Sequence, residues 1–513
     1  MPVTPLPTNP DIDQLKNLAR ELQQRVRAGH PTAVDAVRKH HPRLANLDPR
    51  RDAATNFRLA DAQLVIARSH GCRSWVALRE QVAVVRDLTR RPDQVAVGAA
   101  LDTDEARADG LVSLACLTYG DDLLSRLAAA RRIHDAHPHL ACVSFAAACA
   151  IGDESAVRAA LDADPGAATR RTGPFEWDPI LYVTYSRLNT DDPMHDHVGV
   201  ATVLLACGAD PDAGYLWDGN IPPFTALTGA LGGGEGGQPP HRQALELAQV
   251  LLEAGADAND GQVIYNRTFG TDDRHFELLF RFGLGQGDGG PWRRRFGDAL
   301  DSSSQMLRGQ LHWAITHSRL ARVRLLADHG VDIAAPFTDV RQHYWHDERT
   351  PLQLARLNNQ PEIAACLLDH GAPDTPPDPD DTMVAALTSG DSACADAADA
   401  AHPGALDRVR AARPGLMVWA AAQGRVDVVR LLLDLGFDVN ARGRGDVPIE
   451  DPWETALHHA AHHAHVELAR LLLDAGADPD SRDARFDAPP LGWAQHAGAA
   501  ETVELLTPLT AVR

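Results

Sequence analysis

One short, glycine-centred segment recurs along most of this chain, and its recurrence limits the possible folds more than any other feature. An apolar stretch ends each time in Gly-Ala-Asp or a close variant, with the glycine at positions 208, 255, 330, 371, 436 and 476. Glycine is typical of a helix C-terminus, because it adopts the left-handed conformation found there at little cost. A unit that returns in this way predicts a row of stacked helix pairs and not one compact core.

The spacing of these glycines also predicts where degenerate units lie. The intervals are 47, 75, 41, 65 and 40 residues. Units built from two short helices are about 33 to 47 residues long, so each long interval predicts an additional unit. Residues 275–285 fill the first long interval, and residues 383–404 fill the second.

Residues 455–480, TALHHAAHHAHVELARLLLDAGADPD, contain one complete unit. Thr455 opens a first helix, the stretch VELARLLL forms a second apolar helix, and Gly476 ends it. The segment resembles the ankyrin repeat, whose pattern is TPLHxAA…GHxEVVxLLLxxGADxN. The resemblance covers roughly the last 320 residues strongly and the earlier part weakly. It implies an all-α fold, an ankyrin-repeat solenoid of stacked helix pairs with irregular middle repeats and a helical N-terminal segment.

Five histidines stand between His458 and His465, and their i,i+4 pairs raise the question of a metal site. The metalloprotease motif needs a glutamate directly after its first histidine, and His459 or Ala460 occupies that place. The resemblance implies that His458 ties the turn between repeats and that His465 is the second consensus histidine. The other three, His459, His462 and His463, are interpreted as a polar, solvated helix face. We therefore expect no metal site and no cofactor.

Charge and cysteine content exclude several classes of partner. Residues 1–95 carry 16 Lys+Arg against 10 Asp+Glu, a net +6, so residues 96–513 carry 33 against 60, a net −27. An acidic body of this kind repels phosphate backbones, which excludes nucleic acid as an expected partner. Seven scattered cysteines without a CxxC pair, an N-terminus without a signal sequence and the lack of long apolar runs predict a cytoplasmic protein that does not enter a membrane.

Composition divides the chain into four expected parts. They are a helical N-terminal segment (1–95), degenerate ankyrin repeats with long loops (96–372), a Pro/Asp-rich connector (373–382) and C-terminal ankyrin repeats (383–513). The bacterial character of the chain is inferred from its preference for arginine, since Lys16 and Lys39 are its two lysines.

Aromatic residues point to the middle of the chain as a binding region. Of 27 Phe, Trp and Tyr, 18 lie between Phe175 and Trp345. Large rigid rings concentrate at binding surfaces, although degenerate repeats also use them to fill space that consensus alanines would leave. The candidate binding residues are Trp217, Tyr265, Trp313, Tyr344 and Trp345.

Two short motifs are candidates for catalysis. HYWHDE places His343 and His346 beside two carboxylates, and DPDDT places Asp378, Asp380 and Asp381 in the DxDD pattern of proton-initiated terpene cyclases. In that chemistry an acid held protonated in an apolar pocket donates its proton to an alkene. The alternative is that these aspartates cap the helix that begins near Met383.

The function expected from these features is a cytoplasmic scaffold that binds a protein or peptide on its concave face, because the resemblance implies protein binding. The alternative is an enzyme of the cyclase or lyase type that transforms a small molecule, with its site among the aromatic-rich irregular repeats of residues 175–345.

Overall fold

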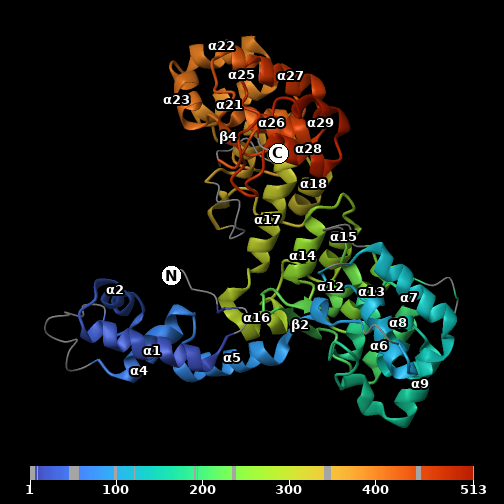
Figure 1. Ribbon diagram of the computed structural model, residues 1–513. Helices are drawn as coiled ribbons and strands as arrows, with labels where there is room; N and C mark the ends of the chain where they lie inside the picture. Colours follow the sequence, from blue (N-terminus) through green and yellow to red (C-terminus); the bar gives the residue numbers. More distant parts are fainter. Residues whose placement is uncertain are drawn as a thin grey trace. The chain divides into compact units, whose positions relative to one another are not determined.

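The computed structural model describes residues 6–7, 10–44, 57–97, 101–120, 122–189, 192, 194–233, 239–339, 348–445 and 452–511. These residues are mostly helical and belong to two compact units, Met1–Met306 and Leu307–Arg513 (Figure 1). The fold is the all-α ankyrin-type solenoid expected from the sequence. Among the described residues, no helix has the length and apolar character needed to cross a membrane.

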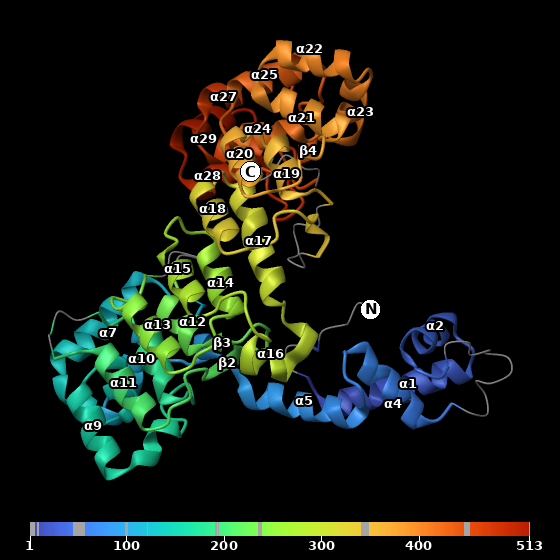
Figure 2. The ribbon, with the colours of Figure 1, turned by 180° about the vertical axis from the view of Figure 1, so that it is seen from behind.

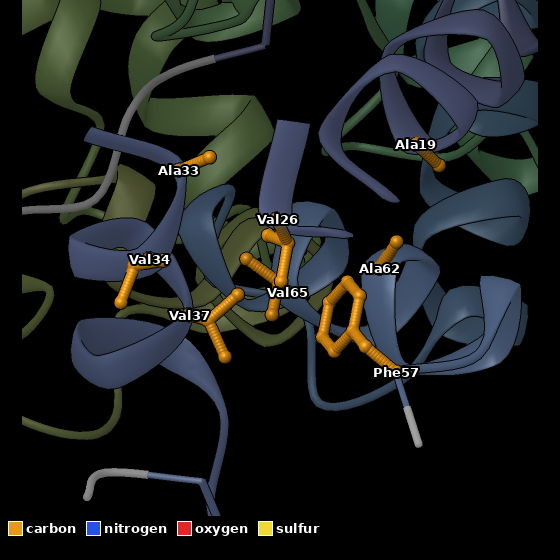
Figure 3. Close-up of a cluster of buried hydrophobic side chains, with 8 residues drawn as sticks. All are labelled: Ala19, Val26, Ala33, Val34, Val37, Phe57, Ala62 and Val65. Atoms are coloured by element: carbon orange, nitrogen blue, oxygen red, sulfur yellow. The ribbon is translucent and has the colours of Figure 1, made fainter. Parts of the chain in front are cut away.

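The first unit begins with four helices that have their own apolar core. They are α1 (Ile12–Arg27), α2 (Pro31–His40), α4 (Leu59–Ser69) and α5 (Trp75–Leu88). Helix α1 is amphipathic, and its buried face meets α2 and α4 in a cluster that contains Val26, Val37, Phe57 and Val65 (Figure 3). A second cluster joins α1, α4 and α5. The described residues of this region therefore form a helical bundle.

Helix pairs follow in the same unit and stack in two rows. In the first row each helix contacts the next, in the order α6 (Asp104–Ala115), α8 (Phe145–Ile151), α10 (Pro179–Tyr185), α12 (Ala226–Leu231) and α14 (Gly261–Thr268). Their partners are α7 (Leu124–Ala136), α9 (Glu154–Ala163), α11 (His197–Ala206), α13 (Ala244–Glu253) and α15 (Arg274–Arg281), followed by α16 (Gly290–Phe296). Short 3-10 turns are η1 (Pro92–Gln94), η2 (Pro138–Cys142), η3 (Pro165–Thr169) and η5 (Gly297–Ala299).

A small sheet joins the N-terminal helices to these repeats. Its strands are β1 (Thr89–Arg90), β2 (Gly214–Trp217) and β3 (Phe224–Thr225), in the order β1-β2-β3. Strand β2 forms an antiparallel finger with β3, in which Tyr215 lies opposite Phe224. Strand β1 adds to the other edge of β2 in parallel, with Thr89 opposite Leu216.

Most middle-region rings near this sheet are packed in the core. Trp177 lies 5.0 Å from both Tyr185 and Tyr215, and Tyr215 lies 5.7 Å from Phe224, between ring centroids. All four rings are buried. The concentration of aromatics in this part of the chain thus serves packing, because large rings fill the space between irregular repeats.

The second unit continues the helix pairs. They are α17 (Ser303–Thr316), which contains the division between the units, with α18 (Leu320–Asp328), α19 (Pro351–Leu357) with α20 (Pro361–Asp369), α21 (Pro379–Ser389) with α22 (Ser392–Ala401), α24 (Leu416–Ala422) with α25 (Val426–Asp434), α26 (Ala456–His462) with α27 (Val466–Asp474), and α28 (Pro490–Ala497) with α29 (Ala500–Leu506). Helix α23 (Ala405–Ala412) is additional, and η6 (Phe337–Asp339) is a 3-10 turn. Strands β4 (Arg442–Gly443) and β5 (Glu454–Thr455) form a second finger, and β4 contacts α24 (Figure 2).

The recurring glycines have the conformation that their position requires. Gly476 has a φ of 94°, and the amide of the next residue, Ala477, donates to the Leu472 carbonyl at 2.9 Å. Gly255 repeats this arrangement with a φ of 101°. A side chain at either position would be strained, so glycine ends the second helix and starts the return of the chain.

Candidate protein-binding surface on the C-terminal repeats

The aromatic residues proposed for binding lie in different surroundings. Trp217 ends β2, and its indole N–H donates to the Thr118 carbonyl at 2.8 Å. Tyr265 lies on α14 with 38% of its surface exposed, edge-on to Phe269. Trp313 is buried in the second unit, with the Arg322 guanidinium 5.0 Å from its ring. Tyr344 and Trp345 lie outside the described residues.

The structure brings two of these residues to one loop. Thr118 accepts the hydrogen bond from Trp217, and the hydroxyl of the next residue, Tyr119, accepts one from Asn266 of α14 at 3.0 Å. Helix α14 carries Tyr265. Trp217 and the helix of Tyr265 are therefore connected through residues 118–119.

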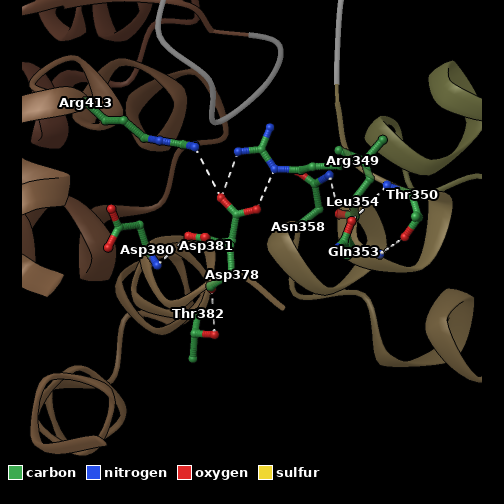
Figure 4. Close-up of polar contacts among 10 residues, drawn as sticks. All are labelled: Arg349, Thr350, Gln353, Leu354, Asn358, Asp378, Asp380, Asp381, Thr382 and Arg413. Atoms are coloured by element: carbon green, nitrogen blue, oxygen red, sulfur yellow. Dashed lines mark hydrogen bonds and ion pairs between the residues drawn. The ribbon is translucent and has the colours of Figure 1, made fainter. Parts of the chain in front are cut away.

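The three aspartates of the DPDDT motif either cap a helix or form ion pairs (Figure 4). Asp378 is the N-cap of α21 and accepts from the Asp380 amide, and Asp380 pairs with Arg408 at 2.7 Å. Asp381 is buried and accepts from Arg349 at 2.6 and 2.7 Å and from Arg413 at 3.2 Å. These contacts differ from the apolar enclosure that the cyclase interpretation needs. His343 and His346 lie outside the described residues.

A cavity of about 480 Å³ in the first unit also has a charged lining. The carboxyl groups of Asp178, Asp210 and Asp212 line it together with the ring of Trp292 and the guanidinium of Arg295. Burial raises the pKa of Asp212 to about 6. The volume is ordinary for a ligand pocket, and its lining combines these charged residues with apolar ones such as Val84 and Leu88.

The histidines of α26 have two distinct roles. The buried His458 accepts from the Thr455 amide at Nδ1 (3.2 Å), and its Nε2 donates to the Ala488 carbonyl of the next repeat at 3.0 Å. Burial lowers the pKa of His458 and so favours the neutral ring that these bonds require. The side chain thus ties two repeats, in agreement with the role that the ankyrin resemblance implies.

His459 is not part of a solvated face, and that expectation was wrong. Its Nε2 lies 2.9 Å from Oε1 of Glu454, and the two side chains are 13% and 5% exposed. Glu454 belongs to β5, so the finger of its own repeat covers the imidazole. Within the described ranges, no group of three or more His, Cys, Asp or Glu is placed to hold a metal ion.

Trp419, His459 and Trp493 occupy the same position in successive repeats. Each is the fourth residue after the N-cap of its helix, in α24, α26 and α28. The three helices contact one another in this order, and all three side chains are partly exposed. The Trp493 ring lies edge-on to His459 at 5.5 Å and to His462 at 5.8 Å. Equivalent positions in stacked repeats thus form a row of rings.

Aromatic and arginine side chains on the neighbouring fingers extend this row. The guanidinium of Arg485 lies 4.3 Å from the ring of Trp453 and 5.3 Å from that of Phe486. Phe486 is 68% exposed, and its ring lies 6.3 Å from Trp493. The Ala484 amide donates to the Trp453 carbonyl at 2.8 Å, which fixes one finger against the next.

We call these residues the finger surface: Trp419, Trp453, His459, Arg485, Phe486 and Trp493. It combines the exposed Phe486 ring, three tryptophans and a guanidinium, the residue types that dominate the energetics of protein interfaces. Sequence reasoning missed it because only a few aromatics lie in this part of the chain. The available signal was the position of Trp493 and Trp419, which match His459 when the repeats are aligned.

The stacked helix pairs and their fingers define a helical-repeat protein. The family model described as ankyrin repeats (many copies) matches residues 417–473 and 457–507, which include every residue of the finger surface. Residues 417–507 of the chain thus consist of ankyrin repeats. No curated protein matches it at a significant level.

Proposed function

We propose that the protein is a scaffold that binds a protein or peptide through the finger surface of its C-terminal repeats. The observation that carries the proposal is the exposed Phe486 ring, which lies beside Trp493 and under the Arg485 guanidinium that also contacts the ring of Trp453. An exposed ring grouped with further rings and a guanidinium is typical of an interaction surface, and repeat arrays bind partners on the extended surfaces that their stacked units form.

The side chains of the surface indicate the chemistry of the partner. Phe486 and Trp493 offer apolar contact, and Arg485 offers a cation that a carboxylate can approach. His459 already pairs with Glu454, so it contributes ring area more than charge. A partner with an apolar side chain next to a carboxylate fits this surface, even though the array as a whole is acidic.

The test is affinity capture from the native cytoplasm with the full chain, followed by binding measurements with the captured protein. Phe486→Ala and Trp493→Ala are each expected to weaken binding by about 2 kcal/mol, roughly thirtyfold in Kd, with unchanged helical circular dichroism. Leu124→Ala is the matched control, because Leu124 is 71% exposed on α7 of the other unit. Equal affinity for the Phe486 variant and this control would refute the proposal.

A further inference from the structure

The segment that follows α5 lies along the edge of the finger in the middle repeats. Thr89 and Arg90 form the parallel strand β1 against Leu216 and Trp217 of β2. The Asp218 amide continues the ladder by donating to the Arg90 carbonyl at 2.9 Å. The edge of β2 that faces away from β3 is therefore occupied by the chain itself.

Two consecutive arginines fix this strand to groups of the repeats. The Nε of Arg91 lies 2.5 Å from Oδ1 of Asp218, and the Nε of Arg90 donates to the Glu176 carbonyl at 3.2 Å. Burial and the nearby Arg171 lower the pKa of Arg90, and the carboxylates of Glu176, Asp87 and Asp178 oppose this effect in part. Both backbone pairing and charge thus select the segment that lies on this edge.

The residues just before the strand are held in a different way. Val85 and Leu88 of α5 pack with Leu216 and Phe296 in a buried cluster, and Arg171 binds both carboxylate oxygens of Asp87 at 3.2 and 3.1 Å. The helix is thus anchored by apolar burial, whereas the strand is two residues long and depends on hydrogen bonds and a half-exposed ion pair. A short edge pairing of this kind opens far more readily than a packed helix.

We propose that the acidic edge of β2 is a docking site for an extended basic segment and that residues 89–91 occupy it in cis. A partner segment would add in parallel to β2 and place one arginine on Asp218 and another near Glu176, as Arg91 and Arg90 do. The charge of the chain supports this assignment, since residues 1–95 carry a net +6 and the remainder a net −27. The proposal is independent of the finger surface, and neither proposal fails with the other.

The first experiment measures occupation of the edge by the chain's own strand. Trypsin cleavage after Arg90 requires the strand to leave β2, and mass spectrometry separates this cut from others. Asp218→Asn removes the carboxylate that binds Arg91, and cleavage is expected to become about tenfold faster, which corresponds to ~1.4 kcal/mol. Glu154→Gln is the control, because it removes a comparable exposed ion pair with Arg158 on α9. Equal cleavage rates for Asp218→Asn and wild type would contradict the proposal that Asp218 holds residues 89–91 on the edge of β2.

The second experiment tests the same edge in trans with a labelled peptide of residues 87–95, DLTRRPDQV, by fluorescence anisotropy. The double variant Arg90→Gln, Arg91→Gln of the full chain keeps the anchored helix and weakens its strand. It is expected to bind the peptide about tenfold more tightly than the wild type does, and to lose this binding when the peptide's arginines are replaced by glutamine. Equal binding to both chains, or binding to neither, would overturn the docking site.

Discussion

The buried His197 is expected to make the first unit sensitive to acid. His197 is fully buried at the start of α11, and its Nε2 donates to the Ala150 carbonyl at 3.0 Å. Burial lowers its pKa to about 4. Because the unfolded chain then binds the proton more strongly, the stability that neutral His197 provides is complete above pH 6.5 and is lost as pH falls toward 4.

This shift gives a measurable pH dependence. A fall of the pKa from 6.5 to about 4 corresponds to an expected loss of about 3 kcal/mol in the free energy of unfolding between pH 7 and pH 4. In urea titrations of the full chain, His197→Gln is expected to show a loss smaller by about this amount, because glutamine can donate to Ala150 without titrating. Leu124→Gln, at an exposed position of α7 without a titratable side chain, serves as control and is expected to leave the pH dependence unchanged. An unaltered pH profile in His197→Gln would contradict the assignment.

Helix α21 illustrates how elements of the second unit are joined by ion pairs. Its Asp381 binds Arg349, which precedes α19, and Arg413, which follows α23. Removing a buried carboxylate shared by two guanidinium groups leaves positive charge without its acceptor in a partly buried place. We expect Asp381→Ala to lower the free energy of unfolding by about 3 kcal/mol.

Asp380 supplies the comparison on the same helix. Its ion pair with Arg408 is largely exposed, so Asp380→Ala is expected to cost at most about 1 kcal/mol. Thermal unfolding followed by circular dichroism measures both variants. If Asp380→Ala were the more damaging change, the ion pair of Asp381 would not be what holds α21 in place.

For the individual elements, the sequence predicts the helices far better than the surfaces that these helices form. The repeated glycines and the TALH segment predict helix pairs, because turn chemistry is local. The pairing of Thr89 with Leu216 has no local signal, since the two residues are far apart in the chain and β1 has only two residues. The exposure of Phe486 likewise depends on how neighbouring fingers stack. Even the dense aromatics of the middle repeats are ambiguous, because a ring such as Trp177 is needed for packing.

For the whole molecule, the dominant physical property is the distribution of charge. Residues 96–513 carry 33 basic against 60 acidic side chains, a net −27, and the +6 of residues 1–95 is small beside it. Part of that positive charge is compensated within the described helices, since Lys16 pairs with Asp13 and Arg25 with Glu21. Arg91 is engaged by Asp218. The net charge of −21 therefore opposes the approach of the chain to a polyanion.

We accordingly expect no binding to duplex DNA at physiological salt. Protein–DNA affinity comes largely from lysines and arginines that displace counterions from the phosphates, and an acidic array opposes this exchange. The measurement is a fluorescence titration of a labelled duplex with the full chain at about 0.15 M salt, and the expected result is no change in anisotropy. A second titration at tenfold lower salt separates true repulsion from weak attraction, because any binding through phosphates strengthens steeply as salt falls. Binding that survives at 0.15 M salt and weakens with added salt would contradict this expectation. It would show that the basic N-terminal helices bind DNA despite the acidic repeats.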